Sequence, residues 1–118
     1  MKNLAPDIKR QRMLIEGFYE IKVDEEVIKK FYEKITKELG LRTYAPPMIH
    51  NATGLGKDIN AGYDCFVPLI DSGIYIGVWT SRNFISMVLY TCKDFDENKA
   101  IEITKKFWKI NEVATHSF

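Results

Sequence analysis

The chain has 118 residues, of which 46% are hydrophobic and 28% charged, which is typical of one globular domain with its own core. Its 17 basic and 16 acidic residues leave a net charge of +1, which argues against a partner that is a nucleic acid or a membrane surface. The polar start MKNLAPDIKRQR lacks the apolar stretch of a signal peptide, and no apolar run approaches the roughly 18 residues of a membrane span. Together with only two cysteines, these features predict a cytoplasmic protein with reduced thiols.

The first third of the chain predicts an arm, a strand and a helix. Residues 1–11 are polar and contain Pro6, so we expect a loose arm. Residues 13–23 are rich in β-formers and predict a strand. Asp24 is a favourable N-cap for a helix over 24–39, and Gly40 is a typical stop. Apolar residues recur through this helix at helical spacing, at Ile28, Phe31, Ile35 and Leu39.

The remainder predicts a run of strands followed by a second helix. We expect strands at 41–53, 63–71, 73–79 and 83–92. Pro46-Pro47 breaks or delays the first of these, and Pro68 favours an edge position or a bulge for the second. A helix over about 96–108, capped by Asp94 or Asp96, has an inner face of Ala100, Ile101, Thr104, Phe107 and Trp108.

The order of these elements predicts the fold class. A strand, a helix, several strands and a helix make an α+β two-layer sandwich, with both helices on one face of a mostly antiparallel sheet. We expect a single domain over residues 1–118, with a short tail of mixed character at 109–118. The GLGK stretch at 54–57 lacks the spacing of a phosphate loop and predicts a turn. The histidines and cysteines are too scattered to predict a metal site.

Residues 62–92 carry a more specific pattern. They read GYDCFVPLIDSGIYIGVWTS and then RNFISMVLYTC. This stretch resembles, without a gap, the small prokaryotic S-adenosylmethionine decarboxylases, whose pattern is close to G-x-S-G-x-x-x-x-x-E-S-H-x-S-I-H-T-W-P-E followed by a strand ending T-C-G. QRMLIEGFYE and DENKAIEITKKF resemble the family's first strand and last helix, and His50 matches a histidine of its second strand.

The resemblance implies a pyruvoyl enzyme built from its own backbone. In that family a serine attacks the carbonyl before it, and the resulting ester eliminates to leave a pyruvoyl group that decarboxylates the substrate. The frame puts Ser72 in the place of this serine, Asp71 in that of the preceding glutamate and Cys92 in that of the proton donor. From the residues alone, Ser72 reads equally as a turn serine before glycine, and Cys92 as a small apolar residue at a strand end.

Several positions depart from the family pattern. Gly77 stands where the family has the histidine needed for self-processing, and glycine has no side chain to act as an acid or base. Asp64 replaces a serine that helps the ester step, and is otherwise a solvated strand-end carboxylate. Ser81 replaces the glutamate associated with the ribose hydroxyls of the substrate. Trp79 is retained, although a tryptophan at this spacing is also typical of a core or an interface.

Three functions follow as hypotheses. The first is a divergent member that does not process itself, lacks a cofactor and acts as a small-ligand-binding or regulatory homologue linked to polyamine metabolism, as a homodimer or the partner of an active paralogue. The second is an active pyruvoyl-dependent decarboxylase of S-adenosylmethionine or another amino acid, self-cleaving at Asp71-Ser72, with Asp64, Tyr75 or His50 replacing the missing histidine. The third is a domain whose similarity is only ancestral.

Strand alternation makes the site specific enough to check. Tyr75, Gly77 and Trp79 share one side of their strand, and Cys92 shares a side of the next strand with Phe84, Ser86, Val88 and Tyr90. We expect Ser72 and Cys92 to lie close together with Asp64 nearby, and substrate contacts from Trp79, Ser81 and Tyr75. We also expect a histidine at position 77 to restore some cleavage.

Overall fold

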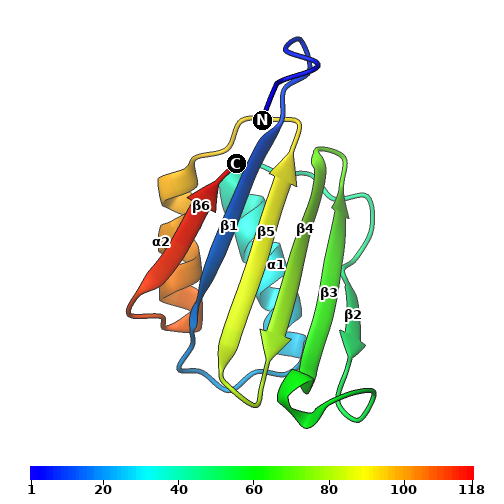
Figure 1. Ribbon diagram of the computed structural model, residues 1–118, viewed down its shortest axis with the longest axis vertical. Helices are drawn as coiled ribbons and strands as arrows, with labels where there is room; N and C mark the ends of the chain where they lie inside the picture. The colour runs from blue at the N-terminus through cyan, green and yellow to red at the C-terminus, as the bar shows by residue number, and fades with distance from the viewer.

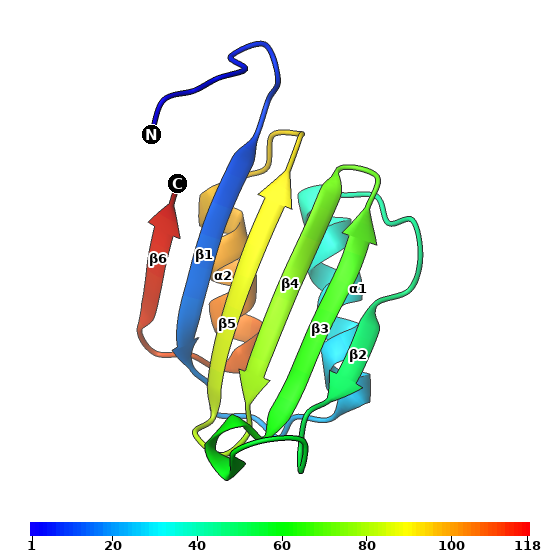
Figure 2. The same ribbon diagram turned by 45° about the vertical axis from the view of Figure 1, so that its right-hand side comes forward.

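The computed structural model describes residues 1–118 as one six-stranded antiparallel sheet with two helices on the same face (Figure 1, Figure 2). The strands lie in the order β2-β3-β4-β5-β1-β6. In chain order the elements are β1 (Gln11–Phe18), α1 (Glu25–Leu39), β2 (Met48–Asn51), a short 3-10 turn η1 (Asp58–Asn60), β3 (Gly62–Leu69), β4 (Ser72–Trp79), β5 (Phe84–Thr91), α2 (Glu97–Trp108) and β6 (Val113–Ser117). The predicted two-layer α+β sandwich is confirmed.

Helix α1 begins and ends where its capping residues predict. The Asp24 carboxylate accepts a hydrogen bond of 2.9 Å from the Val27 backbone N–H. Gly40 ends the helix with a φ of +68°, in the left-handed region that favours glycine. The predicted apolar stripe of the helix is buried, at Ile28, Phe31, Ile35 and Leu39.

The core lies between the sheet and the two helices, and Trp108 is the largest side chain in it. Trp108 is 0% exposed and packs against the rings of Phe31 and Tyr19, at centroid distances of 5.4 and 5.5 Å. The expectation that Phe107 is buried is wrong, because it is only half-buried. Phe107 lies at the edge of the core, where α2 meets α1. Its ring packs against that of Phe31, with the two ring centres 5.1 Å apart.

Three predicted boundaries differ from the structure. The first strand ends at Phe18 rather than 23, and the second is confined to Met48–Asn51, after the two prolines. The tail forms a strand, β6, which pairs with β1 along its length. The sequence VATHS of β6 gave no signal because four of its five residues are exposed, so no apolar alternation marks it.

Pro68 lies in β3, which is paired with β4 along its whole length on one side but with β2 along only part of its length on the other. Strand β2 pairs with β3 from Tyr63 to Phe66 and therefore stops before Pro68. Beyond that point residues 42–44 run beside β3, where the Tyr44 N–H donates to the Pro68 carbonyl at 2.9 Å. The second side of β3 is thus completed by a segment that directly follows α1.

The face of the sheet turned away from the helices, here called the open face, carries many aromatic and apolar side chains. In Figure 1 this face is turned toward the viewer, and the helices lie behind it. Its exposed or half-buried members are Leu14, Phe18, Phe66, Tyr75, Phe84, Val88 and Tyr90.

Neither helix is long and apolar enough to cross a membrane.

Candidate functional site

Ser72 opens β4 directly after the tight turn from β3, and its backbone is strained. Its φ is +116°, one of only three positive values at non-glycine residues in the chain. A residue with a Cβ in such a region costs about 1–3 kcal/mol, which the surrounding structure must supply. Ladder pairing with Leu69 on one side and Thr91 on the other holds Ser72 in place.

The carbonyl before Ser72 is held by Cys92. The Cys92 backbone N–H donates to the Asp71 carbonyl oxygen at 3.0 Å. Because Ser72 also pairs with Thr91, the neighbour of Cys92, the predicted proximity of Ser72 and Cys92 is confirmed. The oxygen that would become negative on attack by Ser72 therefore already has one donor.

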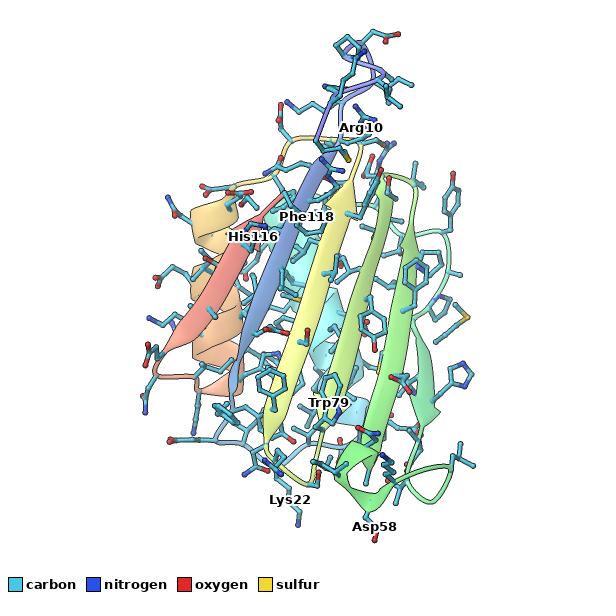
Figure 3. The ribbon with its side chains drawn as sticks, in the orientation of Figure 1. Arg10, Lys22, Asp58, Trp79, His116 and Phe118 are labelled. Carbon is cyan, nitrogen blue, oxygen red and sulfur yellow. The ribbon has the colours of Figure 1, made fainter.

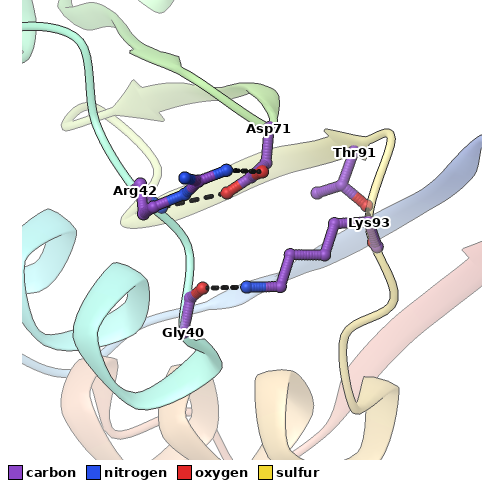
Figure 4. A network of polar contacts seen from close by, with 5 residues as sticks. All are labelled: Gly40, Arg42, Asp71, Thr91 and Lys93. Carbon is purple, nitrogen blue, oxygen red and sulfur yellow. Dashed lines mark hydrogen bonds and ion pairs between the residues drawn. The ribbon is translucent and has the colours of Figure 1, made fainter.

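The Asp71 side chain turns inward and pairs with Arg42, a residue that the sequence analysis did not single out (Figure 4). Arg42 Nη2 donates to Asp71 Oδ1 at 3.1 Å, and the Arg42 backbone N–H donates to Oδ2 at 3.2 Å. Only 5% of the Asp71 side chain is exposed. The hydrogen bond from the Arg42 side chain, followed by that from its backbone, lowers the pKa of Asp71. The carboxylate is therefore a poor base for a proton on Ser72.

A second contact ties the same region to the end of α1 (Figure 4). Lys93 Nζ donates to the Gly40 carbonyl at 2.7 Å, and Thr91 Oγ1 donates to the Lys93 carbonyl at 2.6 Å. Side-chain contacts thus join the strained hairpin and the end of β5 to the end of α1, in addition to the backbone hydrogen bonds between the strands.

The ion pair predicts a shift in acid sensitivity. Because the pKa of Asp71 in the folded chain lies below its unfolded value of about 3.9, its stabilising contribution is present above that value and is lost as the pH falls through the folded pKa. An Arg42→Met variant should be less stable than the unaltered chain at pH 7, and the difference should narrow as the pH falls towards 3, since a protonated Asp71 gains nothing from the guanidinium. Urea unfolding between pH 3 and 7 measures this, and superimposable profiles would contradict the role given to Arg42.

The strain at Ser72 also predicts a stability change. Ser72→Gly should stabilise the chain by about 1 kcal/mol, because relief of the strain exceeds the roughly 0.5–1 kcal/mol entropic cost of glycine. Ser72→Ala keeps the Cβ and should give no such gain. Urea unfolding of both variants measures the difference, and equal stabilities would show that Ser72 is not strained.

A second group of candidate residues surrounds Gly77, well away from Ser72. Across the sheet His50 pairs with Asp64, and Asp64 with Gly77. Position 77 lies five residues along β4 from Ser72, about 17 Å at the rise of a strand. The expectation that Asp64 lies near Ser72 is therefore wrong within one chain, because the hairpin register places it opposite Gly77 instead of near the turn.

The space over Gly77 is filled by two neighbours from its own strand. A Cβ at this position would lie 2.9 Å from Tyr75 Oη and 3.0 Å from Trp79 Cζ3. Tyr75 Oη donates to Asp64 Oδ1 at 3.0 Å. Burial, followed by this hydrogen bond, raises the pKa of Tyr75 to about 12. The three residues suggested as replacements for the histidine, Asp64, Tyr75 and His50, thus lie together.

A cavity of about 390 Å³ adjoins Asp64 and Trp79, between the sheet and the loop that carries η1. Trp79 Nε1 donates to Asn60 Oδ1 at 3.2 Å, so η1 fixes the indole at the rim (Figure 3). Ser81 does not line this cavity, and its hydroxyl donates to the Ile59 carbonyl at 2.6 Å. Asn60 was missed because its role depends on the path of the loop, for which the sequence has no periodic signal.

Both the sequence and the fold of this chain are similar to those of known proteins. The model of the S-adenosylmethionine decarboxylase family matches residues 15–118. The fold is similar to the crystal structure of the adenosylmethionine decarboxylase from Aquifex aeolicus VF5, with a TM-score of 0.72, 17% identity, and coverage of 94% of this chain and 89% of that chain. No curated protein sequence matches significantly. Because the family model spans most of the chain, from β1 through β6, the chain belongs to the S-adenosylmethionine decarboxylase family.

Proposed function

We propose that this chain is a family member that does not cleave itself and that binds a small ligand as a regulatory or binding homologue linked to polyamine metabolism. The observation that carries the proposal is at Gly77. The position that holds a histidine in the family pattern has no side chain, and Tyr75 and Trp79 occupy the space that one would need. The family depends in general on a pyruvoyl group, and this chain lacks the histidine that the family pattern has at position 77.

The residues around Ser72 fit the start of pyruvoyl formation but not its completion. The strained φ of Ser72 and the Cys92 N–H on the Asp71 carbonyl both favour attack by the hydroxyl. Elimination then requires a base for the α-proton of residue 72. Asp71 is paired with Arg42, and Gly77 has nothing to offer. The pyruvoyl group therefore does not fit this site, and we assign no catalytic step to it.

The cavity beside Asp64 supports a cationic ligand. An exposed carboxylate and an indole ring in the lining of one cavity are a favourable environment for an amine or a sulfonium, because the charge and the ring quadrupole attract the same cation. The volume of about 390 Å³ suits a small metabolite. S-adenosylmethionine or a related amine or amino acid is the ligand class that we propose, with Asp64 and Trp79 as its contacts.

We further propose a dimer formed through the open face, either with a second copy or with an active paralogue. Its exposed aromatic residues include Phe66, Tyr75 and Tyr90, an arrangement that suits burial against another protein. The register adds a second argument. A side chain at position 77 lies too far from Ser72 of its own chain to act on it, so a family histidine at this position acts on a partner's serine.

The alternative is an active decarboxylase that uses the group around Gly77 in place of the histidine. The strained Ser72 and the donor on the Asp71 carbonyl favour this alternative. Tyr75 is unfavourable as its base, because a pKa of about 12 keeps the hydroxyl protonated at neutral pH. His50 and Asp64 would be the remaining candidates.

Both thiols are free, Cys65 buried and Cys92 exposed, in keeping with the cytoplasmic location that we propose.

The intact mass of the purified protein tests the main proposal. We expect one species at the full-length mass and no fragment beginning at position 72. Hydroxylamine, which cleaves esters far faster than amides, should release no 1–71 fragment unless Ser72 has already attacked. Two fragments divided between Asp71 and Ser72 in untreated protein would refute the proposal and establish the active alternative.

Ligand binding separates the regulatory function from a merely ancestral similarity. Titration with S-adenosylmethionine, followed by calorimetry, should show saturable binding that an Asp64→Asn variant weakens at least about tenfold, since a hydrogen bond to a charged group is worth roughly 1.5–3 kcal/mol. Asp58→Asn, which removes a carboxylate outside the lining of the cavity, is the matched control. Equal binding by both variants would exclude Asp64 as the cation contact.

A further inference from the structure

A second concave site lies on the β1–β6 side of the sheet, where the N-terminal arm folds over the start of β1. Figure 3 shows Arg10, His116 and Phe118 gathered at this end of the molecule. A cavity of about 440 Å³ is lined there by Met1, Asn3, Ile8, Arg10, Arg12 and Phe118. None of these residues belongs to the groups around Ser72 or Asp64.

The two arginines are held in different ways. Arg10 Nη2 donates to Asn3 Oδ1 and, at 3.2 Å, to the Ala5 carbonyl, so the arm orients its guanidinium. Arg12 lies with its Cζ 5.4 Å from the ring centre of Phe118. Its Nε is buried and has no hydrogen-bond partner. A buried donor left without a partner costs about 1–3 kcal/mol, so an acceptor that reaches this N–H would recover part of that cost.

No carboxylate side chain balances the two positive charges. The ion pairs of the chain are made by Lys9, Lys29, Lys34 and Arg42. None of the residues that line the cavity is acidic, and two carboxylates of this part of the chain are engaged elsewhere, Asp94 with Lys9 and Glu97 with the Ser117 hydroxyl. Two guanidinium groups that share a cavity without an acidic residue repel one another, and an anion between them removes that repulsion.

We propose that Arg10 and Arg12 bind the oxyanion of a small molecule, a phosphate or a carboxylate, with the Phe118 ring packed against Arg12. A guanidinium presents its N–H groups as a planar fork that matches two oxygens of either anion. The unpartnered Arg12 Nε supplies one of these donors. The proposal is independent of the ligand suggested for the Asp64 cavity, because it uses other residues and the opposite charge.

Side-chain NMR of the full chain tests the site directly. Sodium phosphate and, separately, sodium citrate are titrated at constant ionic strength while the Nε–H signals of the arginines are recorded. We expect a saturable shift of the Arg12 and Arg10 signals and none at Arg82, which lies at the other end of the sheet. The anion that saturates at the lower concentration identifies the class, phosphate or carboxylate.

Variants make the test decisive. Arg12→Gln should weaken anion binding at least tenfold, Arg10→Gln should act in the same direction, and Lys99→Gln on the exposed surface of α2 should leave binding unchanged. If Arg12→Gln does not fold, Arg10→Gln still tests the site, because Arg10 precedes β1. Shifts that never saturate, or an equal loss in Lys99→Gln, would refute the proposal by showing only general screening of charge.

Discussion

A Gly77→His/Tyr75→Ala double variant is expected to cleave itself between Asp71 and Ser72 about 10²–10⁴-fold faster than the unaltered chain, the usual contribution of a general acid-base group. The strained Ser72 and the donor on the Asp71 carbonyl are already in place. What the unaltered chain lacks is a group to take the α-proton. Time courses of intact mass, with fragments 1–71 and 72–118 as products, measure the gain.

The second substitution is needed because of the space over Gly77. A Cβ would lie 2.9 Å from Tyr75 Oη and 3.0 Å from Trp79 Cζ3, so both side chains must shift before an imidazole fits. The sequence alone predicts some cleavage from Gly77→His. We now expect that variant to cleave less than the double variant, because its imidazole must first displace these two side chains. Removing the Tyr75 side chain vacates the hydroxyl position and releases Asp64.

A mixing experiment tests which chain the histidine serves. A triple variant with Gly77→His, Tyr75→Ala and Ser72→Ala has the base but no nucleophile. Because position 77 is about 17 Å from Ser72 of its own chain, refolding this variant with the unaltered chain should cause cleavage of the unaltered chain only. A folded, dimeric double variant that stays intact would contradict the role assigned to position 77.

A Val88→Glu variant is expected to weaken the proposed dimer by about 100-fold or more. Val88 lies on β5, one of the two central strands of the sheet, and its side chain belongs to the open face. In a two-fold interface, central residues lie near their own copies, so two carboxylates would be buried close together. Like charges juxtaposed in an interface cost several kcal/mol, and each 1.4 kcal/mol is a tenfold change.

Sedimentation equilibrium measures this effect. The unaltered chain should sediment at twice the chain mass and Val88→Glu at the mass of one chain. Asn98→Glu adds the same charge to the exposed surface of α2 and should leave the mass unchanged. Dissociation by Asn98→Glu, with no effect of Val88→Glu, would place the interface on the helical layer instead of the open face.

The sequence predicts those elements whose signals are local. Helix α1 combines a capping aspartate, a buried stripe and a terminal glycine, and each of these depends only on its neighbours along the chain. Strand β6 could not be predicted, because its place is fixed by pairing with β1, about a hundred residues earlier. Phe107 was misjudged because helical spacing defines a face and not the depth to which each residue on it is buried.

The same distinction applies to the candidate site. Cys92 was placed beside Ser72 correctly because the gapless family frame sets the two residues at adjoining ends of neighbouring strands. Asp64 was misplaced because the tight turn between β3 and β4 sets the register of the hairpin, which pairs Asp64 with Gly77 and leaves Leu69 opposite Ser72. Arg42 gave no signal at all, since its ion pair with Asp71 joins residues 29 positions apart through a segment with no periodic pattern.

The contrasting places of the two tryptophans give this chain a pair of optical probes. Trp108 is enclosed by aromatic rings at the centre of the core, whereas Trp79 is half-exposed at the rim of the Asp64 cavity with its N–H on Asn60. Intrinsic fluorescence therefore has two separable sources. The blue-shifted emission of Trp108 follows global unfolding, while the emission of Trp79 follows occupancy of the cavity, and a Trp79→Phe variant isolates the first without any added label.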